Sequence, residues 1–308
     1  MTTGGAAAVR GAHRHPMAAL VVANLVYAGA FPASEVALRE LGPMTLAGFR
    51  FLVAALLLAP VALPALRRIT LAQTLRLLSI AALGLWLQMV LIYYGIDAAN
   101  GAIAALLVGL EPVLIALWAA LLLGERFGGR RAAGLAVGLC GSLLVAGIGA
   151  SGGAKPESIL LLLGTGLAFS WFTVSSKPFL ARHRPLELTA AISVLGAAVA
   201  VLPMAAELAL GNGLRDPDPL TWAAVLYLGI GNSVVAYALW NRALLGLPAA
   251  VVGGSLYAQP VLGAGLSWLA FHDPLPVTFL PGTALVLLGV WIASGRGSLR
   301  PAQSGGGA

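Results

Sequence analysis

The segment 101–147, GAIAALLVGLEPVLIALWAALLLGERFGGRRAAGLAVGLCGSLLVAG, decides the fold because its pattern occurs twice. Shifted forward by 148 positions, it lies on 249–295, AAVVGGSLYAQPVLGAGLSWLAFHDPLPVTFLPGTALVLLGVWIASG. Glu111–Leu114 then falls on Gln259–Leu262. The other matched positions are Glu125 with Asp273, Gly134 with Gly282, Gly141 with Gly289, and Gly147 with Gly295. Each copy reads as an apolar helix interrupted by a polar residue and a proline, then an acidic turn and a helix of small residues.

The composition is that of a membrane protein. Only 9% of the residues are charged, 59% are hydrophobic, and the mean hydropathy is +0.93, whereas a soluble domain carries about 25% charged residues. A membrane-spanning helix needs roughly 20 apolar residues. Runs of that kind lie at 17–38, 44–66, 73–95, 100–123, 131–150, 157–180, 186–210, 220–244, 248–271 and 276–294. The sequence predicts an all-α integral membrane protein with ten transmembrane helices.

The same runs define the predicted domains. Residues 1–16 are an N-terminal tail, 17–150 and 157–294 are two repeats of five helices, and 295–308 are a C-terminal tail. The first run, 17–38, follows two arginines, as in a signal peptide. We interpret it as a retained span because it is longer than the roughly 7–15 apolar residues of a signal. The connections between runs are too short for a soluble catalytic domain.

The basic residues segregate between alternate connections. One side collects Arg10, Arg14, Arg67, Arg68, Arg126, Arg130, Arg131, Arg182, Arg184, Arg242, Arg296 and Arg300; the other has Arg39, Lys155 and Arg215. By the positive-inside rule, both termini are expected in the cytoplasm. The net charge of +7 is therefore assigned to orientation, and no nucleic-acid partner is predicted.

The repeat extends backwards with a different offset. Residues 25–45 lie over 167–187, so that Pro43 falls on Pro185 and Glu35 falls on Lys177. The unit then contains five helices. Because five is odd, the second copy enters the membrane from the opposite side, which predicts two inverted five-helix repeats. Secondary transporters use this arrangement, with the substrate site near the midplane at interrupted helices.

Glu111 is the most deeply placed ionisable residue of the predicted spans. Pro112 beside it removes a backbone hydrogen bond, and Gln259 with Pro260 recurs at the matching point of the second copy. A carboxylate here could bind a cation, a proton or a substrate amine, because ionisable groups in a bilayer are costly and usually functional. Alternatively, a protonated Glu111 only bonds a neighbouring helix and the prolines only bend their spans.

The first span carries polar residues on one helical face, among them Asn24 and Tyr27, which we expect to point into the bundle. Glu35 lies near the outer end of this span, and Arg50 lies near the outer start of the next. We expect these two side chains to form a structural ion pair, because buried charges are usually paired.

Aromatic and amide side chains supply further candidates for lining a cavity. The i, i+3, i+4 spacing of Tyr237, Trp240 and Asn241 places them on one helical face. The remaining candidates are Trp86, Tyr93, Tyr257 and Gln259. The alternative is that these residues sit in the interfacial belt or pack in the core, as aromatic residues do in many membrane proteins.

Several classes of function are disfavoured. The four histidines lie outside the spans or at their rims, so neither a histidine base nor a paired-histidine metal site is expected in the bilayer. Cys140 is the one cysteine, which excludes an intramolecular disulfide. Phosphate-binding glycine motifs are absent. We therefore expect no enzyme activity, no metal and no cofactor.

The chain resembles the EamA-type drug/metabolite transporters over nearly its whole length. The likeness rests on Leu110–Val113 (LEPV), Leu123–Arg126 (LGER), Tyr237–Leu244 (YALWNRAL) and Tyr257–Pro260 (YAQP). It implies a multi-pass permease of the bacterial inner (plasma) membrane that exports amino acids or other small metabolites through a cavity between the halves. Glu35 departs from the family, where a lysine is expected, and so does the pair His272–Asp273, where Gly-Glu is commoner.

The sequence thus predicts a secondary exporter of small polar or zwitterionic metabolites, working by alternating access and with Glu111 as the candidate for proton coupling. A permease for phosphorylated sugars or nucleotide-sugars remains an alternative. It would need deeply placed cations, whereas Arg50, Lys177 and Arg242 all lie near the ends of predicted spans. A pore or a structural membrane partner is the alternative of another class. The expected partners are a small-molecule substrate and the lipid bilayer, and a homodimer is left open.

Overall fold

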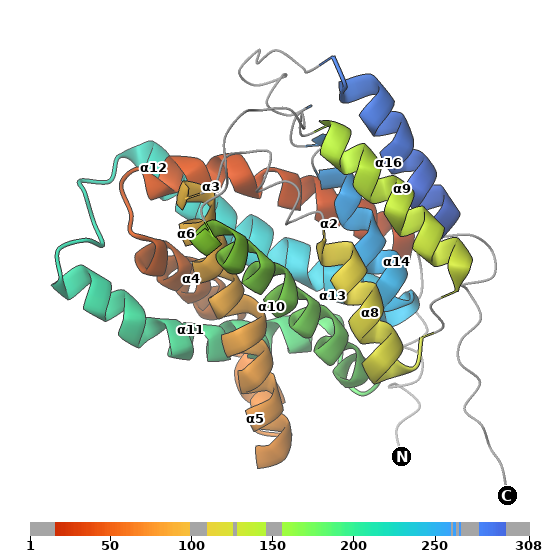
Figure 1. Cartoon of the computed structure of the whole chain (residues 1–308). Helices are drawn as coiled ribbons and strands as arrows, with labels where there is room; N and C mark the ends of the chain where they lie inside the picture. The colour runs from red at the N-terminus through yellow and green to blue at the C-terminus, as the bar shows by residue number, and fades with distance from the viewer. Residues whose placement is uncertain are drawn as a thin grey trace, which may run out of the picture.

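The computed structural model describes residues 16–98, 110–125, 128–145, 156–259, 261–262, 265 and 277–293 (Figure 1). Within these ranges every regular element is a helix, apart from one isolated antiparallel bridge between Leu41 and Leu214. The all-helical class predicted from the sequence is therefore confirmed for the described part of the chain.

The elements of the predicted first repeat begin at Pro16. They are α2 (Pro16–Ala28), α3 (Ala30–Leu38), α4 (Pro43–Leu66), α5 (Leu71–Ser79), the π-helix η1 (Ile80–Trp86), α6 (Leu87–Ala98), α8 (Glu111–Leu123) and α9 (Gly129–Val145). Pro43 stands in the first turn of α4, where a missing N–H breaks no helical bond. Thr70 caps α5 with a reciprocal bond to Gln73.

The elements of the predicted second repeat follow in a similar order. They are α10 (Pro156–Leu180), α11 (Pro185–Ala209), α12 (Pro219–Leu226), the π-helix η2 (Tyr227–Ala236), α13 (Tyr237–Gly246), α14 (Ala249–Gly254), the 3₁₀ turn η3 (Ser255–Tyr257) and α16 (Phe279–Ala293). Pro185 and Pro219 again stand in first turns, and Asp218 caps α12 by accepting from the backbone N–H of Thr221 at 2.7 Å.

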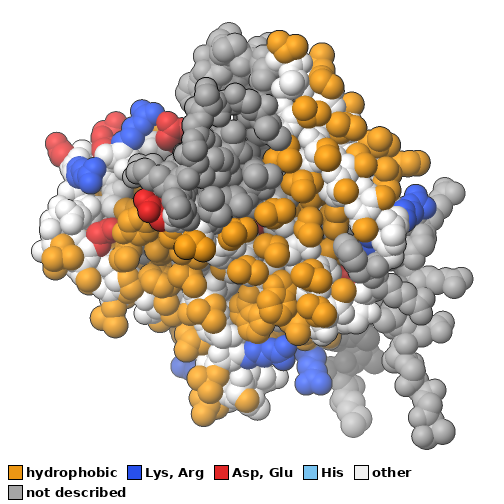
Figure 2. All heavy atoms as spheres, viewed as in Figure 1, with side chains coloured by type: hydrophobic (Ala, Val, Ile, Leu, Met, Phe, Trp, Pro, Cys, Tyr) orange, Lys and Arg blue, Asp and Glu red, His pale blue; other side chains and the backbone are white. Residues whose placement is uncertain are grey.

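Within the described ranges, five helical stretches are long and apolar enough to cross a membrane. They are Pro16–Leu38, Pro43–Leu66, Leu71–Gly95, Pro185–Ala209 and Pro219–Gly246, joined by the shorter apolar helices Glu111–Leu123 and Phe279–Ala293. Figure 2 shows a broad hydrophobic band across the molecule, with charged side chains gathered at its edges. Large apolar side chains such as Leu56 and Leu202 are exposed in this part of the chain, as expected of a surface that faces lipid.

Helix contacts follow the pairing expected of two halves related by a two-fold axis. The pairs α4 with α11 and α9 with α16 each join a helix to its own counterpart, and α8 with α14 joins parts of the counterpart spans four and nine. The pair α2 with α13 is matched by α10 with α6. These contacts favour the predicted inverted repeat. The full set of ten spans stays a prediction, because parts of the fourth and ninth spans lie outside the described residues.

The crossing of α9 and α16 is built from reciprocal glycine contacts, and the two helices run side by side in Figure 1. A Cβ on Gly134 would lie 2.8 Å from the carbonyl oxygen of Gly289, and one on Gly141 would lie 2.7 Å from that of Gly282. In the sequence repeat Gly134 matches Gly282 and Gly141 matches Gly289. Each glycine thus meets the counterpart of the other, which is the contact pattern of a two-fold interface.

A second shared irregularity is the π-helix in the third and eighth spans. Shifting 80–86 forward by 148 positions gives 228–234, which lies inside η2. Segments of π-helix inside α-helices are rare and occur frequently at functional sites. Both segments run directly into helices, α6 and α13, that carry residues of the cavity described below.

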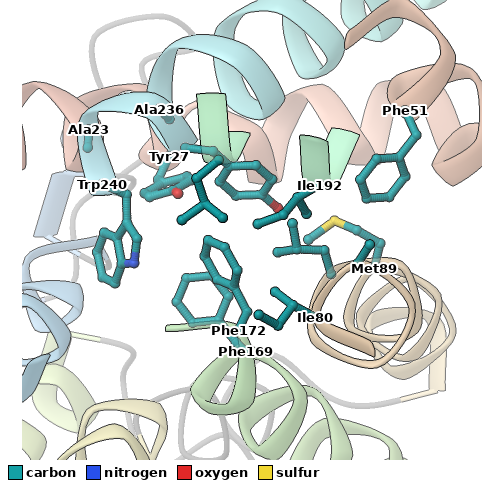
Figure 3. Close-up of a cluster of buried hydrophobic side chains, with 14 of the residues drawn as sticks. Ala23, Tyr27, Phe51, Ile80, Met89, Phe169, Phe172, Ile192, Ala236 and Trp240 are labelled. Atoms are coloured by element: carbon teal, nitrogen blue, oxygen red, sulfur yellow. The ribbon is translucent and has the colours of Figure 1, made fainter. Parts of the chain in front are cut away.

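The centre of the molecule is a layer of aromatic and branched side chains from both halves (Figure 3). Trp240 is fully buried, with its ring centroid 5.8 Å from that of Tyr27 and 5.5 Å from that of Phe169. Phe172 is also fully buried and stacks at 5.5 Å on Tyr237. This layer forms the floor of the cavity.

We expect Gly134→Ala to destabilise the protein. The new Cβ would lie 2.6 Å from the backbone nitrogen of Ala293, so α16 must move away, and overpacking of this kind costs about 1–3 kcal/mol. The measurement is the apparent melting temperature of the purified protein in detergent. The matched control is Gly129→Ala at the start of the same helix, where a Cβ meets open space. Equal melting temperatures for the two variants would contradict the close crossing.

Candidate functional site

A cavity of about 80 Å³ lies between the two predicted halves. Its size allows several water molecules or part of a small solute, since a single water needs only about 10–15 Å³ on this measure. Helices α2, α3, α4, α6 and α8 contribute from the first half, and α10, η2, α13 and η3 from the second. Its polar lining residues are Tyr27, Ser34, Arg50, Gln88, Tyr93, Glu111, Asn232, Tyr237 and Gln259.

Arg50 is the dominant charge of this cavity. It lies two turns into α4 and is only 2% exposed. All its acceptors are neutral: Ser233 Oγ at 2.7 Å from Nε, Asn232 Oδ1 at 2.8 Å, Met89 Sδ at 2.8 Å, Tyr93 Oη at 3.2 Å and Tyr237 Oη at 3.3 Å. The guanidinium thus joins α4 to α6, η2 and α13 without an acidic partner in the described part of the chain.

Glu111 is the acidic side chain of the same cavity. It is 7% exposed and is the first residue of α8, one residue after the described residues resume. Among the described residues, ion pairs within 4 Å join Glu35 to Arg39 and Glu125 to Lys177. Glu111 and Arg50 therefore line one cavity without pairing with each other.

Two further polar groups of the lining have unused hydrogen-bonding capacity. The hydroxyl of Tyr27 and the amide oxygen Oε1 of Gln88 are buried, and neither has a partner within the described structure. Buried polar groups are usually satisfied. A polar solute in the cavity could bond both the unsatisfied donor and the unsatisfied acceptor of its lining.

The structure brings together half of the residues that the sequence singled out for binding. Tyr27, Tyr93, Glu111, Tyr237 and Gln259 all line the cavity. They come from both predicted halves. Whether these side chains bind substrate or couple protons stays a prediction, since their position alone does not test either role.

The other five candidates lie outside the cavity lining. Asn24 donates to Ser255 Oγ at 2.9 Å, and Asn241 donates to Thr189 Oγ1 at 3.0 Å, so both amides tie helices together. Trp240 packs beneath Tyr27, Trp86 packs against the core, and Tyr257 packs between α9 and α16. The shared helical face of Tyr237, Trp240 and Asn241 is therefore divided between cavity, core and a link to α11.

The predicted pair of Glu35 with Arg50 is wrong. Glu35 instead pairs with Arg39 one turn along its own helix at 3.1 Å, and both side chains are about 70% exposed. Arg50 points away from this surface into the cavity. The boundaries of the span were predicted to within one residue, so the physical reason is direction: Arg50 lies on the face of α4 turned towards α6 and η2, whereas Glu35 lies on the exposed surface of α3.

The two prolines differ in what the structure describes. Pro112 stands in the first turn of α8, which begins at Glu111, so its missing N–H breaks no bond within this helix. Pro260, the predicted counterpart, lies outside the described residues. In the second half, the helical path tightens to a 3₁₀ turn at Ser255–Tyr257 just before Gln259.

Sequence reasoning missed Gln88, Asn232 and Ser233. Asn232 and Ser233 are adjacent polar residues in the middle of an apolar run, which is a signal that could have been used. Their inward direction depends on η2, because a π-helix changes which residues share a face. No pattern in the sequence predicts this π-helix.

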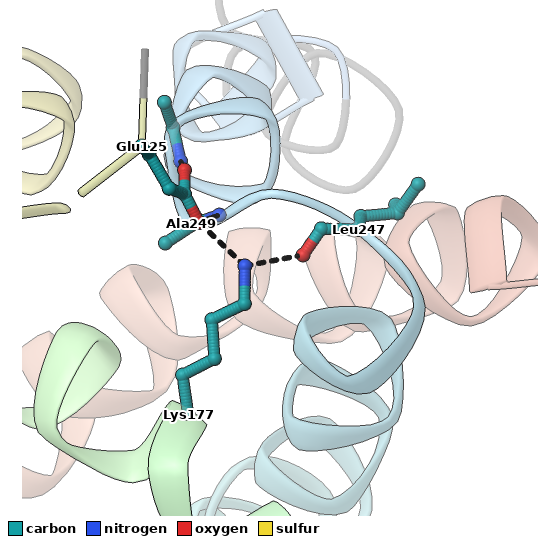
Figure 4. Close-up of polar contacts among 5 residues, drawn as sticks. Glu125, Lys177, Leu247 and Ala249 are labelled. Atoms are coloured by element: carbon teal, nitrogen blue, oxygen red, sulfur yellow. Dashed lines mark hydrogen bonds and ion pairs between the residues drawn. The ribbon is translucent and has the colours of Figure 1, made fainter. Parts of the chain in front are cut away.

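Outside the cavity lining, Glu125 and Lys177 form a polar link between helices (Figure 4). Glu125 accepts from Lys177 Nζ and from the backbone N–H groups of Ala249 and Ala250, and Lys177 also donates to the carbonyl of Leu247 at 3.0 Å. The carboxylate caps the N-terminus of α14, where negative charge is favoured. One acid thus joins the ends of α8 and α10 to the start of α14.

No three of the metal-binding side chains His, Cys, Asp and Glu lie together within the described ranges in a way that could hold an ion.

Comparison with known proteins identifies one transporter family. The profile of the EamA-like transporter family matches residues 16–147 and again 157–295. The chain is 30% identical over 280 residues to a probable terminal-alkyne amino-acid exporter of Streptantibioticus cattleyicolor, covering 90% of this chain and 93% of that protein.

Two further likenesses cover large parts of the chain. The chain is 30% identical over 210 residues to the aromatic amino acid exporter of Ancylobacter novellus, covering 66% of this chain and 70% of that protein. A crystal structure of another protein superposes with a TM-score of 0.76 over 91% of this chain and 96% of that one, at 23% identity. This last likeness shows a shared fold.

We expect Glu125→Ala to lower the apparent melting temperature. The change removes the acceptor of Lys177 and the cap of α14, and hydrogen bonds to charged groups contribute about 1.5–3 kcal/mol. Glu35→Ala is the matched control, because it removes an exposed pair within one helix, and such pairs contribute little. If both variants melt at the same temperature, the link does not hold the helices together.

Proposed function

Because this chain belongs to the EamA-like transporter family, we propose that it exports amino acids or related zwitterionic metabolites by alternating access. Membership makes it a multi-pass membrane protein that carries small molecules and belongs among transporters, not enzymes. The substrate, the direction and the coupling are the proposal.

One observation carries the proposal: a buried acid and a buried base line the same cavity and are not paired with each other. Arg50 and Glu111 are 2% and 7% exposed. Burying unpaired charges is costly, so a solute that brings one negative and one positive group would relieve both. An amino acid in its zwitterionic form has that charge pattern. The names of the two relatives, both amino-acid exporters, support the same class.

The proposed location is the bacterial inner membrane, with both termini in the cytoplasm. The distribution of Arg and Lys between alternate connections supports this orientation. In this orientation the Glu125–Lys177 link lies at the cytoplasmic end. Trp240 lies one turn along α13 from Tyr237 towards that link and is fully buried. The described conformation is then closed towards the cytoplasm, and export requires a second conformation in which this end opens.

Glu111 is the candidate for coupling transport to protons. It is the acidic residue of the cavity lining, and Gln259, its counterpart in the sequence repeat, cannot ionise. A proton bound to Glu111 when the cavity faces outward would be released when it faces inward. Export of substrate in exchange for entering protons would follow.

The permease for phosphorylated sugars or nucleotide-sugars is the second candidate, and one observation favours it. Arg50 was expected near the end of its span, but it lies in the cavity, where an anionic group could reach it. Two features weigh against this substrate. Glu111 in the same cavity repels a multiply charged phosphate, and a volume of about 80 Å³ is small for a nucleotide-sugar.

We expect purified protein in proteoliposomes to export amino acids with saturation. The reason is that alternating access allows one substrate per cycle, so the rate reaches a maximum as the concentration rises. The measurement is efflux of an internal mixture of the standard L-amino acids against protein-free vesicles. Flux that rises linearly with concentration for every solute would point to a pore, and no flux would point to a structural partner.

We expect Glu111→Gln to reduce export driven by an inward proton gradient by about tenfold or more, the range that a lost charged hydrogen bond produces. Exchange of internal for external substrate without a gradient should fall less, because the amide oxygen of glutamine still accepts a hydrogen bond from the ammonium group of the substrate. Gln259→Glu serves as the matched change at the repeat-related position. Unchanged dependence of the rate on pH in Glu111→Gln would remove the proposed coupling role.

A further inference from the structure

We propose that Arg50 binds the substrate's carboxylate, assisted by the phenol groups of Tyr93 and Tyr237, so that a free carboxylate is required for export. This inference rests on the proposed function and goes beyond it by assigning the anion-binding part of the site. The ligand class is an organic carboxylate that also carries an ammonium group.

The first argument is charge. Arg50 is 2% exposed, and its acceptors are an amide, three hydroxyls and a thioether. None of these carries a negative charge. A buried cation with neutral partners retains its attraction for an anion, and that attraction is strong because the surroundings are poorly polarisable. The structure supplies no described carboxylate within 4 Å of it.

The second argument is the ranking of the five acceptors. Ser233 and Asn232 accept at 2.7 and 2.8 Å and position the guanidinium. The bonds to Tyr93 and Tyr237 are longer, at 3.2 and 3.3 Å, and the thioether of Met89 is a weak acceptor. The weak partners are all on Nη1 and Nη2. A carboxylate that replaces them would gain two parallel bonds from this fork.

The third argument is the free donors beside the fork. A phenol that accepts from arginine still has its own proton to donate, and both Tyr93 and Tyr237 line the cavity. The hydroxyl of Tyr27 is buried without a partner, and its ring lies 5.9 Å from that of Tyr237. An anion at this place would be surrounded by donors from α2, α4, α6 and α13.

The same cavity also offers hydrogen-bond acceptors for the ammonium group of the substrate. Glu111 and the unsatisfied Oε1 of Gln88 are acceptors, as an ammonium group needs. The lining therefore offers donors for a carboxylate and acceptors for an ammonium group. An amine without a carboxylate would leave Arg50 without an anion, so we infer that amines are poor substrates.

The experiment compares two sets of solutes in wild-type proteoliposomes. One internal mixture holds the standard L-amino acids, and the other holds their C-terminal amides, which keep the ammonium group and lose the carboxylate. Efflux is measured by mass spectrometry. We expect at least about a tenfold preference for the acids, the effect of losing a hydrogen-bonded ion pair. Equal efflux of acids and amides would overturn the role of Arg50 while leaving the exporter proposal intact. Absence of efflux of both would overturn the exporter proposal itself.

Substitution of Arg50 distinguishes recognition of the carboxylate of the substrate from a purely structural role. In Arg50→Gln we expect export of the acids to fall by about tenfold or more, while export of the amides stays constant or rises. A merely structural role would lower both together. Arg39→Gln is the matched control on the exposed surface, where Arg39 pairs with Glu35, and it should match wild type.

A second variant keeps the test decisive if Arg50→Gln does not fold. Tyr93→Phe combined with Tyr237→Phe removes both phenol groups and keeps both rings. We expect the apparent KM for the acids to rise and that for the amides to remain unchanged. Equal changes in KM for acids and amides in this variant would contradict the proposal.

Discussion

The burial of one guanidinium among neutral groups constrains the whole centre of this protein. Arg50 reaches from α4 to acceptors on α6, η2 and α13, so four elements from both predicted halves must approach within hydrogen-bonding distance of one side chain. Asn232 and Ser233 lie in the π-helix of the eighth span, and Met89 and Tyr93 lie in the helix that directly follows the π-helix of the third. Arg50 lines one cavity together with Glu111 and the aromatic side chains of Tyr27 and Phe169.

Most of the fold could be predicted from the sequence, because lipid imposes a simple rule on it. Long apolar runs bounded by proline or charge must be helices that cross the bilayer, and the runs at 44–66 and 186–210 match described helices within one or two residues. The site could be predicted only in part. Tyr27 and Glu111 were found by depth and helical face, whereas the role of Arg50 depends on η2, whose shifted faces no periodicity reveals.

The two halves are similar in backbone and different in charge. Reciprocal glycines at the α9–α16 crossing and the paired π-helices follow the repeat. Lys177 binds Glu125 across helices, yet its counterpart in the sequence repeat is Glu35, which binds only Arg39 on its own helix. An ion pair therefore joins two helices at Lys177, whereas Glu35 forms its ion pair within one helix. The opposite end is tied by other carboxylates: Glu207 accepts from the backbone N–H of Thr45 at 2.6 Å, and Glu40 accepts from Thr221 Oγ1 at 2.6 Å.

The buried positive charge of Arg50 also affects which ions can enter the cavity. An energised membrane draws inorganic cations inward, and any water-filled path through a carrier is a potential leak. A fixed positive charge in the lining raises the electrostatic energy of sodium and potassium ions in the cavity. A zwitterion carries no net charge and encounters no such barrier. The guanidinium that would bind the carboxylate of the substrate would thus also reduce the leak of inorganic cations through the empty cavity.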